Sequence, residues 1–108
     1  MKTILTLAAA LLASSAISNA AELSGGSVKI GVMNDQSGTY SDFGGKGSVA
    51  AAEIAIEEFN PSAKGIKVEL ISADHQTKPD VASAMARKWY ETEQVDAIAD
   101  LTGSSVAI

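Results

Sequence analysis

Two adjacent serines near the end of the chain, Ser104 and Ser105, are well suited to hold a small anion. They follow an apolar run that is predicted to be a strand, and their turn is predicted to open a helix. Hydroxyl groups and unpaired backbone N–H groups at a helix start form a binding site for a carboxylate. The pattern therefore predicts ligand binding at both serines, with a helix-capping role for one of them as the alternative.

Two aromatic residues, Tyr40 and Phe43, stand in a polar loop that is rich in glycine. An aromatic ring in such a loop is better placed to cover a ligand or a partner surface than to start a core. Phe43 is the stronger candidate of the two. For both rings, a role unrelated to ligand remains the alternative.

The glycines around Lys46 do not form a phosphate-binding loop. Tyr40 stands where the motif needs its first glycine, and Gly47 rather than serine or threonine follows the lysine. No Gly-x-Gly-x-x-Gly motif joins the first predicted strand to its helix, so a dinucleotide fingerprint is missing as well. These observations predict neither a nucleotide nor any other cofactor.

The single histidine, His75, and its neighbour Asp74 follow the second predicted strand. They are too few for a metal site, so surface or capping roles are favoured over catalysis. Asp35 and Asp42 follow the first predicted strand, where phosphoacceptor domains of this fold carry carboxylates. Those domains are cytosolic, whereas the first residues of this chain, described next, predict export. No nucleophile with a paired base is present, so we expect no catalytic residues and no enzyme.

The first residues have the layout of a secretory signal peptide. Lys2 precedes an uncharged apolar run over residues 4–17, and the small residues Ser18-Asn19-Ala20 follow it. We expect residues 1–20 to be removed, residues 21–27 to be a spacer, and the protein to reach the periplasm. The formal net charge of −5 argues against nucleic-acid binding, and with no cysteine the fold needs an apolar core.

Three strand-like runs alternate with two helical patterns after the spacer. The strands are predicted at 28–33, 66–71 and 95–101, the first of them buried on both faces. Val49, Ala52, Ile56 and Phe59 mark the inner face of the first helix, which should end at Asn60-Pro61. The second helix begins near 79 and ends near 93. Its start is either a capping box from Thr77 to Asp80 or Pro79 as the first helical residue.

The second helix places Trp89 on a stripe with Ala82, Met85 and Ala86, which predicts a core position. The alternation of elements predicts an α/β class fold with a doubly wound parallel sheet and strand order 2-1-3. Ligands bind such sheets beyond the carboxyl ends of the strands. The expected crevice lies between the loop at 34–45 and the turn at 102–105.

Three segments together resemble one family: residues 28–38, residues 47–60, and residues 74–89 with 95–105. A first strand ending in Ser-Gly, an aromatic before glycine, and a helix ending in Phe-Asn are similar to the branched-chain amino acid group of periplasmic solute-binding proteins. The resemblance implies a two-lobed receptor of an ABC importer. Residues 28–108 would supply the amino-terminal part of its first lobe, and the natural protein would continue.

The resemblance also implies site residues and partners. Phe43 would line the cleft, and Gly103, Ser104 and Ser105 would hold the carboxylate of an amino acid or a related small carboxylate or amide. Gly103 departs from the serine or threonine of many members, so only its backbone would contribute. The partner would be a permease in the inner membrane. A ligand-sensing ectodomain of a signalling receptor with the same fold is the alternative.

Overall fold

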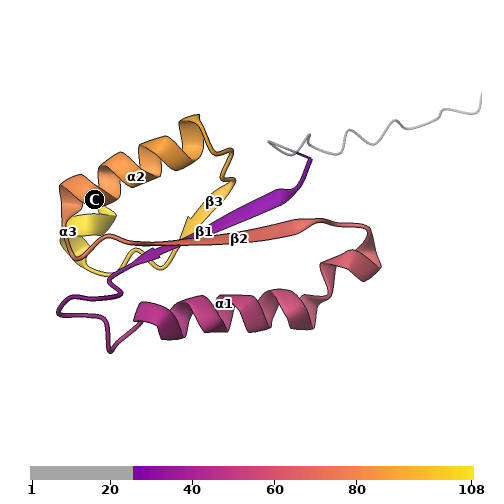
Figure 1. Ribbon diagram of the computed structural model, residues 1–108, viewed down its shortest axis with the longest axis horizontal. Helices are drawn as coiled ribbons and strands as arrows, with labels where there is room; N and C mark the ends of the chain where they lie inside the picture. Colours follow the sequence, from indigo (N-terminus) through magenta and orange to yellow (C-terminus); the bar gives the residue numbers. More distant parts are fainter. Residues whose placement is uncertain (1–25) are drawn as a thin grey trace, which may run out of the picture.

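The computed structural model describes residues 26–108, so the predicted signal peptide and residues 21–25 of the predicted spacer lie outside the described residues. Figure 1 shows the arrangement of the elements. In chain order they are β1 (Val28–Asn34), α1 (Gly45–Phe59), the short 3-10 helix η1 (Pro61–Lys64), β2 (Val68–Asp74), α2 (Pro79–Glu91), β3 (Ala97–Ala99) and α3 (Ser104–Ala107). No helix among these residues is long and apolar enough to cross a membrane.

The three strands form one parallel sheet in the order β2-β1-β3, which confirms the predicted topology. β1 pairs with β2 over its whole length, from Val28 opposite Val68 to Asn34 opposite Asp74. It pairs with β3 over three residues only. α1 lies on one face of the sheet and α2 on the other (Figure 1), so the fold is doubly wound as expected.

The main core lies between the sheet and α2. Met33 of β1 is fully buried there against Ala82, Trp89 and Val95. The partly buried residues packed around them are Ile71, Ala73, Met85, Ala86, Ile98, Leu101 and Val106. The predicted stripe of α2, including the core position of Trp89, is therefore confirmed.

The inner face of α1 is confirmed at three of its four predicted positions. Val49, Ala52 and Ile56 are half-buried, but Phe59 is exposed, so its prediction as a packing residue is wrong. Phe59 is the last residue of α1, and its ring lies 4.6 Å from the Lys64 ammonium instead of packing under the sheet. The helix ends at Asn60 as predicted, with a left-handed backbone there (φ 49°).

The strand boundaries differ from the predicted ones at β2 and β3. β2 begins two residues later and extends to Asp74, because β1 supplies pairing partners up to Asn34. β3 covers only three residues of the predicted range 95–101. Val95 is nevertheless buried just before it, and the N–H of Asp96 donates to the carbonyl of Lys29. Pro79 is the first residue of α2, and no side chain caps this helix, so the second of the two predicted starts holds.

Candidate functional site

The candidate site is the edge of the sheet where all three strands end. Because the strands are parallel, the segments that follow them, 35–44, 75–78 and 100–103, meet at this edge. Figure 1 shows the long loop after β1 and the short α3 on the same side of the molecule. This is the place that the fold argument predicts for a ligand.

Both aromatic residues of the loop after β1 lie at its surface. The Phe43 side chain is 86% exposed and the Tyr40 side chain is 41% exposed. Their ring centroids are 6.3 Å apart and the rings are tilted by 52°. An exposed, paired ring of this kind offers apolar surface to a partner molecule instead of supporting the core.

The loop after β1 touches the turn after β3 at Gly44. A Cβ atom added at Gly44 would lie 3.2 Å from Oδ2 of Asp100 and 3.6 Å from Oγ1 of Thr102. A side chain at this position would be tightly packed against Asp100 and would require a small shift of that side chain. Glycine therefore allows the residue next to Phe43 to lie directly against the turn that leads to Ser104.

Ser104 and Ser105 are the first two residues of α3, and both are exposed. The residue before them, Gly103, has a backbone that favours glycine (φ 101°) and is the N-cap without a side-chain hydrogen bond. The capping alternative for the serines therefore does not hold here. Within residues 26–108 neither hydroxyl has a hydrogen-bond partner, and the first N–H groups of a helix have none inside it.

Asp35 organises the loop that carries the two aromatic rings. Its buried carboxylate accepts hydrogen bonds from the N–H of Gly38 at 2.7 Å and from the N–H of Tyr40 at 2.9 Å. It also accepts one from the hydroxyl of Thr77 at 2.7 Å. The bond from Tyr40 is the largest of several that together lower the pKa of Asp35, although burial opposes the shift.

Asp74 holds the other side of the same loop. It accepts hydrogen bonds from the N–H of Gln36 at 3.0 Å, the hydroxyl of Ser37 at 2.6 Å and the N–H of Gln76 at 2.9 Å. Burial alone would raise the pKa of Asp74, but these hydrogen bonds outweigh it and the pKa is lowered. Asp74 thus fastens the loop after β1 to the turn after β2, and the predicted capping role is not seen, because no side chain caps α1 or α2.

Asp100 joins the end of β3 to the end of β1. Its Oδ2 accepts a hydrogen bond of 2.8 Å from the side-chain amide of Asn34, which also donates to the carbonyl of Gly45 at 2.7 Å. Burial would raise the pKa of Asp100, but hydrogen bonds from Ser48, Asn34 and Thr102 lower it. Three carboxylates, one at or just after the end of each strand, thus connect the segments at this edge.

A surface or a capping role was predicted for His75, and because His75 is fully buried the surface alternative is wrong. Its N–H donates to the carbonyl of Asn34, which continues the pairing of β1 with β2 by one residue. Its Nδ1 accepts a hydrogen bond of 3.0 Å from the N–H of Thr77. The backbone hydrogen bond to Asn34 extends the sheet by one residue and places the imidazole of His75 in the interior. The sequence alone gives no sign of this hydrogen bond.

The organising residues of this edge were not predicted as a set. One signal was present: an aspartate stands at or just after the end of each strand, at Asp35, Asp74 and Asp100. Asp35 also precedes Gly38 by three residues, and the N–H of Gly38 donates to it. Thr77 carried no comparable signal.

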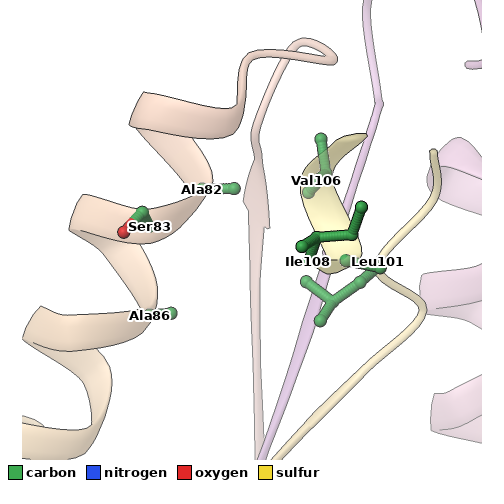
Figure 2. A pocket seen from close by; sticks show the side chains of 7 residues that line it. Ala82, Ser83, Ala86, Leu101, Val106 and Ile108 are labelled. Carbon is green, nitrogen blue, oxygen red and sulfur yellow. The ribbon is translucent and has the colours of Figure 1, made fainter. Parts of the chain in front are cut away.

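A separate pocket of ≈ 220 Å³ lies between α2 and α3. Figure 2 shows Ala82 and Ala86 of α2 facing Leu101, Val106 and Ile108, and Ser83 of α2 also lines the pocket. Six of the seven lining residues have apolar side chains, Ser83 being the exception, and neither Phe43 nor Ser104 is among them. The pocket therefore does not belong to the candidate site. Among residues 26–108 no group of three or more histidine or acidic residues is placed to hold a metal ion.

A family model described as periplasmic binding protein matches residues 27–108. The chain belongs to the periplasmic binding protein family. This assignment agrees with the resemblance found in the sequence and with the expectation of a binding protein instead of an enzyme. A search of curated protein sequences found no match.

Solved periplasmic binding proteins have the same fold as this family member. One from Burkholderia mallei is 38% identical, with a TM-score of 0.71 over 76% of this chain and 22% of its own. A branched chain amino acid ABC transporter periplasmic ligand-binding protein from Burkholderia xenovorans LB400 is 49% identical, with a TM-score of 0.70 over 74% and 21%. A type 1 protein from Bordetella pertussis Tohama I is 29% identical, with a TM-score of 0.59 over 74% and 22%. This chain thus spans about a fifth of their length.

Proposed function

We propose that this chain forms part of the first lobe of a periplasmic receptor for an ABC importer. The receptor captures an amino acid or a related small carboxylate or amide and delivers it to a permease in the inner membrane. One observation carries the proposal: the exposed ring of Phe43 and the unpartnered hydroxyls of Ser104 and Ser105 stand on two segments that touch at Gly44. The name of the Burkholderia xenovorans relative favours an importer over a signalling receptor.

The proposed roles follow from the chemistry of each group. Phe43 covers the apolar part of the ligand. The hydroxyls and N–H groups of Ser104 and Ser105 receive the carboxylate, and Gly103 leaves the backbone open to it. The negative net charge does not oppose this, because oriented N–H groups bind an anion locally.

The periplasmic location rests on the family and on the apolar start of the chain. We expect residues 1–20 to be cleaved, so that the exported protein begins at Ala21. Amino-terminal sequencing of protein from the periplasmic fraction checks this, and retention of Met1 would contradict it.

The binding role is tested on the purified protein that contains this chain. Native mass spectrometry identifies any small molecule that remains bound, and calorimetric titration with leucine, isoleucine, valine, benzoate and urea measures affinity. A dissociation constant in the micromolar range or below for at least one compound supports the proposal. Absence of both a retained molecule and measurable binding contradicts it.

The role of Phe43 is tested by Phe43→Ala. Loss of an aromatic side chain that is buried against ligand weakens binding by roughly 10- to 100-fold. The matched control is Phe59→Ala, because Phe59 is also an exposed phenylalanine but lies at the far end of α1. Equal effects of the two variants would contradict the role of Phe43.

A further inference from the structure

The turn after β2 has a backbone that its residues rarely adopt. Gln76 and Thr77 both have positive φ angles, 53° and 55°, and neither is glycine. Two consecutive left-handed residues of this kind persist only where surrounding contacts hold them. The side chains of the two residues just before them supply these contacts.

Asp74 and His75 fix the turn through its own N–H groups. The N–H of Gln76 donates to Oδ1 of Asp74 at 2.9 Å, and the N–H of Thr77 donates to Nδ1 of the buried His75 at 3.0 Å. The N–H of Lys78 donates to the carbonyl of His75 at 2.8 Å. The position of Thr77 is thus set from the interior of the protein.

The fixed turn places Thr77 between the other two segments of the edge. Its hydroxyl donates to Oδ2 of Asp35 at 2.7 Å, and the same oxygen accepts the N–H of Tyr40. Its methyl carbon lies 3.9 Å from the position of a Cβ atom on Gly103. Thr77 is therefore hydrogen-bonded to the loop of Phe43 on one side and lies beside the turn of Ser104 on the other.

We infer that Thr77 is a positioning residue, which sets the loop of Phe43 relative to the turn of Ser104 without touching ligand itself. The hydroxyl acts through the carboxylate of Asp35, which in turn holds the N–H groups of Gly38 and Tyr40. The methyl group occupies space beside Gly103, 3.9 Å from where a Cβ atom on that residue would lie. The consequence for ligand affinity rests on the proposed function, but the effect on the loop does not.

Two substitutions separate the hydroxyl from the shape of the side chain. Thr77→Val keeps the volume and removes the donor to Asp35, whereas Thr77→Ser keeps the donor and removes the methyl group. The matched control is Thr92→Val, because the Thr92 hydroxyl makes a hydrogen bond of similar length, 2.8 Å to the carbonyl of Lys88, far from this edge.

Amide hydrogen exchange of residues 36–44 is measured without ligand. A bond to a charged acceptor is strong enough that its loss should speed exchange of the Gly38 and Tyr40 amides roughly tenfold in Thr77→Val. Thr77→Ser should remain within about threefold of the wild-type rate, and Thr92→Val should leave this segment unchanged. Wild-type rates in Thr77→Val overturn the inference.

Asp35→Asn provides a second route if Thr77→Val does not fold. This substitution keeps the shape of the side chain but removes its charge, so exchange at Gly38 and Tyr40 should rise similarly. Unchanged exchange in a folded Asp35→Asn variant overturns the inference.

Calorimetric titration with leucine, or with whichever of the five compounds binds most tightly, then measures affinity. We expect Thr77→Val to bind roughly 5- to 10-fold more weakly than wild type and Thr77→Ser to restore most of the loss. Faster exchange with unchanged affinity overturns the link to binding. If none of the five compounds binds wild type, the proposed ligand class fails, while the exchange data still decide whether Thr77 positions the loop.

Discussion

The indole ring of Trp89 lies directly against the backbone of Gly31. A Cβ atom added at Gly31 would overlap the six-membered ring, with Cε3 of Trp89 only 2.6 Å away. Glycine at the centre of β1 thus lets the largest side chain of α2 approach the sheet, and Trp89 is 5% exposed as a result. The contact seats α2 over the core that supports the candidate site.

We expect Gly31→Ala to lower the free energy of unfolding by about 1–3 kcal/mol, because the new methyl group overpacks the core. Chemical denaturation monitored by circular dichroism measures this change. In a Trp89→Leu background the ring is absent, so the penalty of Gly31→Ala should shrink, which a double-mutant cycle detects.

Gly47→Ala is the matched control for Gly31→Ala. Gly47 lies in α1 with nothing within 4 Å of its added Cβ atom, so alanine should raise the free energy of unfolding by roughly 0.4–1 kcal/mol. The overpacking explanation is wrong if both alanine variants shift the free energy in the same direction.

The sequence predicted the order and type of the elements better than the residues at which they begin and end. The β-branched run in β1 and the stripe ending in Trp89 are local patterns. The burial that they predict was found along the stripe and in the second half of β1, whereas the first three residues of β1 are only half-buried. Residues 72–74 have little intrinsic preference for a strand, yet they extend β2 because Val32, Met33 and Asn34 lie opposite them. Such pairing joins residues about forty positions apart, so a local pattern does not contain it.

The sequence predicted where the candidate site lies, but not the hydrogen bonds that hold its loops. A parallel sheet of order 2-1-3 brings the loops of Phe43 and Ser104 to one edge whatever their contacts are. The hydrogen bond between Thr77 and Asp35 joins residues 42 positions apart, and the buried His75 depends on the same tertiary approach. Neither contact follows from residue type and spacing alone.

Acid should destabilise the protein through Asp35, Asp74 and Asp100. Their pKa values are lowered in the folded state, so their contribution to the free energy of unfolding is fully present above about pH 5. It is lost as the pH falls through the unfolded value near 3.8 towards the lower folded values. Denaturation at a series of pH values between 6 and 2.5 measures this loss.

Asp35→Asn should flatten this pH dependence, because one carboxylate no longer takes up a proton on unfolding. Asp42→Asn is the control, since Asp42 is exposed and has no hydrogen bond within residues 26–108. A slope equally reduced by both substitutions would show that general charge, not the hydrogen-bonded carboxylate, causes the acid sensitivity.

His75 should contribute to stability through its Nδ1 acceptor. His75→Leu fills much of the same space but leaves the N–H of Thr77 without an acceptor, which costs about 1–3 kcal/mol. His75→Asn places an amide oxygen near the position of Nδ1 and should retain more of the free energy of unfolding, despite its smaller volume. Denaturant titration ranks the two variants, and a more stable leucine variant would assign His75 to packing alone.

Ser104→Ala separates ligand binding from helix capping. The N-cap of α3 is Gly103 and no side chain caps this helix, so loss of the Ser104 hydroxyl should leave the melting temperature within about 1 °C of wild type. A hydrogen bond from this hydroxyl to a ligand carboxylate contributes roughly 1.5–3 kcal/mol, so affinity should fall about 10- to 100-fold. Ser62→Ala, an exposed serine in η1, serves as the control for both measurements. Calorimetric titration and thermal melting of the same preparations measure the two quantities. Unchanged affinity with a lowered melting temperature would show that Ser104 stabilises the fold and does not bind ligand.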